Sequence, residues 1–226
     1  MARQPQQHPW RRCPLGEHWV KQYRRRGKRG FITVRGHCAK NPSKKDQIYP
    51  DEIQGIAADH FDWLTGPPTS NDLDFRDGNK FNEFIRGWTK YWNEVLETDP
   101  PLDPNLIKAL IASESSFNLK AKKRAGRRAG YARGLMQITD QTLEILRNEN
   151  GELKNHLVNV SQPDMFDPNL NICAGVRWLF RKMTIAKSKY GTSATWRHAV
   201  AVYKSYKPDD DGMNGFDEFY RRLTHD

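Results

Sequence analysis

The chain has 226 residues, of which 37% are hydrophobic and 11% aromatic, enough for one large domain or a domain with a smaller module. Its net charge of +10 attracts polyanions, whether nucleic acid, acidic lipid or an anionic cell wall. The charged fraction of 28% excludes a wholly disordered chain, and the short apolar runs predict no membrane-spanning helix.

The first 50 residues are rich in Arg, Lys, Gly and Pro and nearly free of acidic residues. The stretch WVKQYRRRGKRGFITVRGHC alternates around a Gly-rich centre. It predicts a β-hairpin with strands Trp19 to Arg24 and Phe31 to Gly36, joined by a basic turn. A helix is expected from Asp51 to Leu64, and the turn-rich stretch 65–79 is typical of a linker.

Three cysteines are too few for a disulfide framework. Cys13 and Cys38 could pair if the protein reaches an oxidising compartment, and the sequence leaves this open. Cys173 lies on the apolar face of an expected helix and is interpreted as a buried hydrophobic residue. A zinc site formed by the first two cysteines with His18 and His37 is a weaker alternative, because no CxxC pair is present. The expected metal content is therefore none.

From Lys80 onward the apolar residues recur at helical spacing. The first of these helices ends at Asp99-Pro-Pro, and the next begins at Pro104 with Asp103 as its N-cap. Further helices are expected near Ile138 with Thr139 as cap, from Pro168 to about Lys189, from Ala194 to Tyr206 and from about Phe216 to Leu223. No β pattern of comparable strength follows residue 60.

These patterns predict a mainly α protein whose α-helical domain follows a small basic module formed by a β-hairpin and a helix. We divide the chain into the N-terminal module at 1–66, the linker at 67–79 and the helical domain at 80–226. The basic module is a candidate targeting or delivery element.

One carboxylate lies at the end of the helix that begins at Pro104. Glu114 follows Leu110 and Ile111 by four and three residues, so it continues the buried face of that helix. Burial and the negative end of the helix dipole both favour the neutral acid, which a general acid requires. The alternative is an apolar face that ends at Ile111 and leaves Glu114 in water, and periodicity alone favours it.

Seven Lys and Arg residues follow between residues 120 and 133, and no acidic residue occurs between Glu114 and Asp140. Tyr131 is the single aromatic residue of this run, whereas binding sites for single-stranded nucleic acid interleave several. The run suits contact with a polyanion, and a solvated loop is the default expectation.

Four short motifs occur in a fixed order: ESSFN at 114–118, GLMQIT at 134–139, FDPNLNICAGVRWL at 166–179 and AVYKSY at 201–206. Together they resemble the catalytic domain of the soluble lytic transglycosylases, relatives of goose-type lysozyme, over about residues 80–206. The resemblance implies a lysozyme-like helical domain that cleaves the glycan strands of peptidoglycan.

The resemblance also implies roles for individual residues. Glu114 matches the single catalytic acid and base of the family, and the hydroxyl of Tyr203 would lie beside its carboxylate and hold it by a hydrogen bond. The implied substrate-binding residues are Ser115, Gly134, Leu135, Met136 and Gln137.

Two departures from the family pattern stand out. The interval of 20 residues from Glu114 to Gly134 is longer than usual and carries basic residues where the family commonly has a Ser. Lys204 stands where the family has Asn after the Tyr, so that wall of the site is expected to differ.

The implied reaction cleaves the β-1,4 bond between N-acetylmuramic acid and N-acetylglucosamine and forms a 1,6-anhydro ring, without metal or cofactor. A hydrolytic muramidase on the same fold is the near alternative and would need a second acid, for which Asp140, Asp164 and Asp167 are candidates. A nucleic-acid-binding protein and an inactive glycan-binding module are the alternatives from other classes.

The first residues, MARQPQQHPWRR, contain no apolar region typical of a signal peptide. Since peptidoglycan lies outside the cytoplasmic membrane, we hypothesise delivery to the periplasm or wall by a dedicated secretion, phage or conjugation route. The expected partners are then the glycan strands, a secretion machinery and, for an antibacterial effector, an immunity protein. No specific nucleic acid is expected as a partner.

Overall fold

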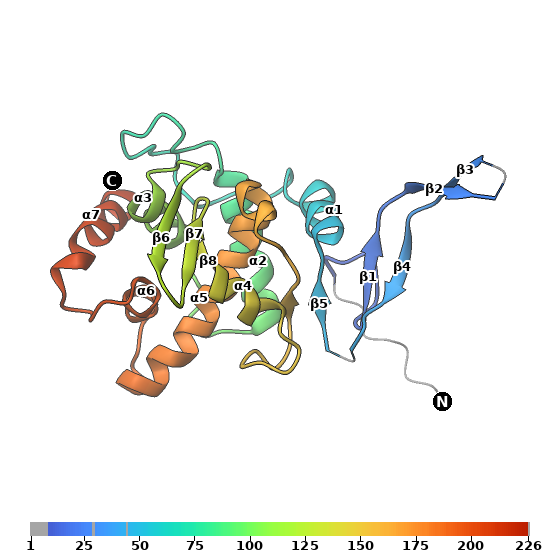
Figure 1. Cartoon of the computed structure of the whole chain (residues 1–226). Coiled ribbons are helices and arrows are strands. Elements are labelled where there is room, and N and C mark those ends of the chain that lie inside the picture. Colours follow the sequence, from blue (N-terminus) through green and yellow to red (C-terminus); the bar gives the residue numbers. More distant parts are fainter. Residues whose placement is uncertain (1–8, 29, 44, 226) are drawn as a thin grey trace.

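The computed structural model describes residues 9–28, 30–43 and 45–225, and its fold class is mainly α, as expected (Figure 1). The helices of the described residues are α1 Pro50–His60, α2 Asn82–Leu96, α3 Pro104–Ser115, α4 Asp140–Arg147, α5 Pro168–Tyr190, α6 Trp196–Lys204 and α7 Asn214–Thr224. Short 3₁₀ turns occupy Pro163–Phe166 and Asp211–Met213. Within these residues no helix combines the length and apolarity needed to cross a bilayer.

Three helices after residue 80 begin at a capping side chain, and the sequence predicted the caps Asp103 and Thr139. The side chains of Asp103, Thr139 and Asp167 accept hydrogen bonds from the backbone N–H groups of Asn105, Thr142 and Leu170. Each acceptor satisfies one of the donors that the first helical turn leaves unpaired. α3 and α5 also have Pro in the first turn, where its missing N–H costs nothing.

The core forms around α5, which packs against α1, α2 and α6. Aromatic side chains of α2 fill much of it: Trp88, Tyr91 and Trp92 are each at most 1% exposed. The indole N–H of Trp92 donates to the carbonyl of Cys173 at 3.1 Å. Cys173 itself is a free, fully buried thiol, which confirms its interpretation as a core residue.

The N-terminal hairpin is present but is divided into two ladders. At its base β1, Glu17–Val20, pairs antiparallel with β4, His37–Lys40. Further out β2, Tyr23–Gly27, pairs with β3, Gly30–Val34, and this outer ladder projects away from the helices (Figure 1).

A disulfide joins Cys13 to Cys38, as the sequence suggested for an oxidising compartment. The bond links the segment before β1 to β4 at the base of the hairpin. It occupies both thiols that the zinc alternative would have used as ligands, so that alternative is wrong.

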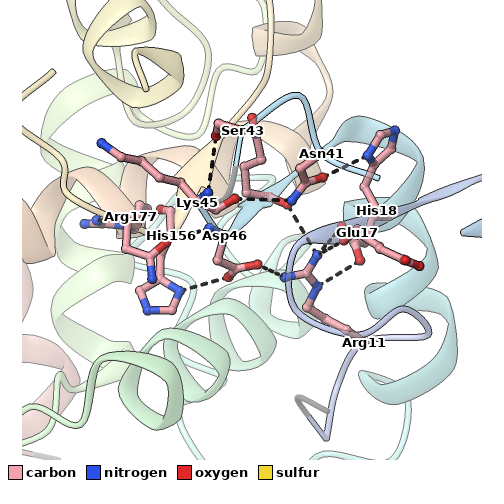
Figure 2. A network of polar contacts seen from close by, with 12 residues as sticks. Arg11, Glu17, His18, Asn41, Ser43, Lys45, Asp46, His156 and Arg177 are labelled. Carbon is pink, nitrogen blue, oxygen red and sulfur yellow. Dashed lines mark hydrogen bonds and ion pairs between the residues drawn. The ribbon is translucent and has the colours of Figure 1, made fainter. Parts of the chain in front are cut away.

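A network of polar contacts joins the N-terminal segment to the body of the protein (Figure 2). The guanidinium of Arg11 is fully buried and donates to the carboxylates of Glu52 and Asp46. Asp46 in turn accepts from His156 at 2.9 Å. Although burial opposes its ionisation, the contacts with His156 and Arg11 lower the pKa of Asp46.

Strand pairing and apolar contacts reinforce this connection. β5, Gln47–Ile48, pairs in parallel with β9, Leu157–Val158, across more than 100 residues of sequence. Trp10 and α1 contribute to the same hydrophobic core as the helices that follow residue 80. The division of the chain at residues 66 and 79 stays a prediction.

The stretch 65–79 is held by contacts with α3. Leu73 is 1% exposed within the core. The ammonium of Lys108, on α3, is fully buried and donates at 2.7 Å to the carbonyl of Thr69 and to the side-chain oxygen of Asn79. A residue of α3 therefore holds two points of this stretch, Thr69 and Asn79.

The basic run after Glu114 is not the solvated loop that the sequence indicated. β6, Lys122–Gly126, and β7, Gly130–Arg133, form an antiparallel hairpin, and β8, Ile138–Thr139, adds a third strand. The expectation of no strand here was wrong because β6 is exposed along its whole length and so lacks the apolar alternation of a half-buried strand. The strands are fixed by Asp140, which accepts from the backbone of Tyr131 and pairs with Arg133.

Candidate active site

Glu114 lies in the last turn of α3, one residue before the helix ends. Ser116 and Phe117 follow with positive φ angles of 51° and 60°, which turn the chain sharply, and Phe117 then packs in the core. This turn leaves the Glu114 side chain at the edge of the core with 18% of its surface exposed. The solvated alternative, which periodicity alone favoured, is therefore wrong, and Glu114 is partly buried.

A cation that the sequence singled out only as a departure contacts this carboxylate. Lys204, the last residue of α6, places its Nζ 2.8 Å from Oε1 of Glu114 and 3.2 Å from Oγ of Ser113. At this distance the ammonium of Lys204 and the carboxylate of Glu114 form a direct ion pair. The sequence therefore missed one of the groups that act on Glu114.

Tyr203 lies beside the same carboxylate, but its hydrogen bond goes elsewhere. The phenol donates to the carbonyl oxygen of Met136 at 2.6 Å. Burial and the nearby negative charge of Glu114 raise the pKa of Tyr203 well above its usual value. The protonated hydroxyl thus ties α6 to the segment 134–137, and its one proton is directed away from Glu114.

The segment 134–137 fits closely against α5. Gly134 has a φ of +72°, and a Cβ added there would lie 2.1 Å from the carbonyl oxygen of Met165, so only glycine is accommodated. Asn171 of α5 accepts from the backbone N–H of Met136 at 2.9 Å and donates to the carbonyl of Arg133 at 3.1 Å. At Gly175, also on α5, an added Cβ would clash with the Met136 side chain.

The predicted substrate-binding residues differ in what they expose. Leu135 and Met136 are fully buried, so their side chains serve the core. Gln137 is partly exposed and has a φ of 49°, with its amide donating to the carbonyl of Gly134 at 2.8 Å. The hydroxyl of Ser115 is partly buried and donates to the carbonyl of Ile111 at 3.2 Å. Of these residues, Gln137 presents the side chain best suited to a ligand.

A pocket of about 330 Å³ adjoins this segment. Gln137 and Tyr203 line it together with Trp178 and Lys182 of α5. An aromatic face beside amide, hydroxyl and ammonium groups is the kind of surface that binds a sugar ring.

Three further acids were candidates for a second catalytic carboxylate, and each is engaged in local structure. Burial opposes the ionisation of Asp140, but the backbone N–H of Tyr131 and the side chain of Arg133 lower the pKa of Asp140. Asp164 accepts from the backbone N–H and hydroxyl of Ser161, both at 2.7 Å. Asp167 caps α5 and accepts from the Gln54 side chain at 3.0 Å.

The fold and the site define a lysozyme-like helical domain with a partly buried acid, Glu114, at the end of α3. The family model described as Transglycosylase SLT domain matches residues 91–206, just over half of the chain. The chain belongs to this family and is a peptidoglycan-cleaving enzyme of the transglycosylase type that acts on the cell wall. No curated protein and no solved structure matched it.

Proposed function

We propose that the protein is a lytic transglycosylase that cleaves the bond between N-acetylmuramic acid and N-acetylglucosamine with Glu114 as its single acid and base. The observation that carries the proposal is the place of Glu114. It is partly buried beside Tyr203, while the three other candidate carboxylates are bound by neighbouring groups.

In the proposed reaction the carboxyl group of Glu114 first gives up a proton and later takes one back. Glu114 donates its proton to the glycosidic oxygen as the bond from that oxygen to C1 of the muramic acid breaks. The N-acetyl group of the sugar stabilises the positive charge that develops at C1. The carboxylate then takes the proton of the 6-hydroxyl as that oxygen bonds to C1, which closes the 1,6-anhydro ring and restores the acid without consuming water.

Digestion of purified peptidoglycan tests the proposal, with mass spectrometry of the released fragments. We expect fragments ending in 1,6-anhydro-muramic acid from the wild type and a fall of about 100-fold or more in rate for Glu114→Gln. Glu144→Gln makes the same chemical change on an exposed face of α4 and should retain full activity. Reducing ends in the products would instead establish the hydrolytic muramidase, and full activity of Glu114→Gln would refute the assignment of the acid.

We further propose that the outer hairpin formed by β2 and β3 is a wall-binding element. Three consecutive arginines, Arg24 to Arg26, are exposed on β2, and Phe31 on β3 is 70% exposed with Arg24 stacked over its ring at 5.4 Å. No acidic residue occurs between Glu17 and Asp46. This charge complements the carboxylates of peptidoglycan stem peptides.

Co-sedimentation with purified sacculi tests this element. Changing Arg24, Arg25 and Arg26 to Gln should weaken binding and reduce its salt dependence. The matched control changes Lys122, Lys123 and Arg124 on the equally exposed strand β6. Equal loss in both variants would mean that net charge acts, not the hairpin, and preferential binding of the wild type to nucleic acid would support the alternative from another class.

The biological setting is likewise a proposal: delivery by a secretion, phage or conjugation route, with an immunity protein if the enzyme is an antibacterial effector. The Cys13–Cys38 disulfide supports an oxidising destination such as the periplasm. Expression with and without a periplasmic signal tests it. Toxicity confined to the periplasmic form is expected, and lysis from the cytoplasmic form without a helper protein would contradict it.

A further inference from the structure

The strongest unassigned feature is the ion pair between Glu114 and Lys204. The Lys204 side chain is only 9% exposed and that of Glu114 18%, so water and salt screen the pair less than they screen a surface ion pair. The pair joins the C-terminal ends of two helices, α3 and α6. At such an end the helix dipole favours a cation and disfavours an anion, so Lys204 offsets the unfavourable place of Glu114.

The ammonium is held from two sides. Ser113 donates its hydroxyl proton to the carbonyl of Leu110 at 3.0 Å, which leaves its oxygen lone pairs to accept from Lys204 at 3.2 Å. The second bond, at 2.8 Å, goes to Oε1 of Glu114. Because one carboxylate oxygen is engaged, the geometry points to Oε2 as the oxygen that carries the reacting proton.

The titratable groups that face the Glu114 carboxylate are the ammonium of Lys204 and the phenol of Tyr203, both from α6. Several charged groups of the neighbouring elements are paired elsewhere. On α7, which packs along α3, they are Asp217 with Arg197, Glu218 with Arg221 and Arg222 with Asp74; on α2, Lys90 with Glu94; and on the sheet, Arg133 with Asp140.

We propose that Lys204 is a positioning residue that holds Oε1 of Glu114 and presents Oε2 to the glycosidic oxygen. This proposal rests on the proposed function of Glu114. The reacting proton leaves Oε2 for the leaving oxygen and later returns to Oε2 from the 6-hydroxyl. Lys204 keeps all its protons and stabilises the carboxylate between the two transfers.

Steady-state kinetics on purified peptidoglycan test this role. In Lys204→Met kcat should fall by about 10-fold or more with little change in KM, because the carboxylate formed by proton transfer loses its counter-charge. Lys204→Arg keeps the charge and should retain most of the wild-type kcat. Lys207→Met removes the same charge from the exposed turn after α6 and should leave kcat and KM unchanged.

A wild-type kcat in folded Lys204→Met would overturn the proposal, and so would a loss of kcat in Lys204→Arg as large as that in Lys204→Met. If the wild type itself released no fragments, the proposed function would fail, and this proposal with it. Lys204→Gln replaces Lys204→Met if the methionine variant does not fold.

Discussion

Two clusters of charge lie in different parts of the molecule and differ in how completely their charges are satisfied. Arg11 is fully buried and donates to two carboxylates and to the backbone carbonyls of Glu17 and Gln47. Lys204 meets one carboxylate oxygen and one hydroxyl, and Glu114 keeps contact with solvent. The Arg11 cluster, in which the buried guanidinium has several acceptors, is suited to anchoring the N-terminal segment. The Lys204 cluster leaves one oxygen of Glu114 available for chemistry. Changes to the Arg11 cluster should therefore alter stability, and changes to Lys204 should alter the reaction.

The largest effect on stability is expected from Arg11→Met. It would leave the buried carboxylates of Glu52 and Asp46 without their main counter-charge and lower the free energy of unfolding by about 3–5 kcal/mol. Arg12→Met is the matched control, because Arg12 pairs with Asp59 at the surface and its loss should cost less than about 1 kcal/mol. Denaturant titration measures both, and kcat per folded molecule should not change. A large loss of kcat in folded Arg11→Met would contradict the assignment of the Arg11 cluster to stability alone.

A smaller effect is expected from removing the disulfide. Changing both Cys13 and Cys38 to Ser opens a link between residues separated by 25 positions and should cost about 3 kcal/mol of unfolding free energy. Reductant should lower the thermal midpoint of the wild type and leave that of the double variant where it is. If the double variant also lost activity at temperatures where it stays folded, the N-terminal region would have a role in catalysis as well as in stability, which would contradict the comparison.

Lys108 is a third buried cation, and it differs from Arg11 and Lys204 because it donates to the neutral oxygens of Thr69 and Asn79. Burial lowers the pKa of Lys108 to about 8 from its usual 10.5, although Asp72 opposes the shift. Between these values the unfolded chain binds the extra proton, so stability should rise with pH. From pH 7 to pH 10 the wild type should gain about 2 kcal/mol relative to Lys108→Met. Parallel pH profiles of unfolding free energy for the two proteins would contradict this.

Local chemistry made much of the fold predictable. Asp103 and Asp167 are followed by Pro and then by apolar residues at helical spacing, so the starts of α3 and α5 could be read from a few neighbouring residues. The same periodicity allowed Glu114 to be partly buried but favoured a solvated side chain, and the packed structure decided for partial burial. The β6–β7 hairpin was not predicted because its strands carry exposed Lys and Arg. Its position also depends on Asp140, which lies beyond the second strand.

The sequence by itself determined the helices, the place of Glu114 on α3 and, through four ordered motifs, the family that cleaves peptidoglycan. Tertiary structure alone decided which groups surround that acid. Lys204 reaches Glu114 from 90 residues away, and Tyr203 directs its proton to Met136 because α6 ends where it does against the segment 134–137. Backbone patterns depend on near neighbours, whereas the ionisation of a side chain depends on whichever charges the packed helices bring within a few ångströms.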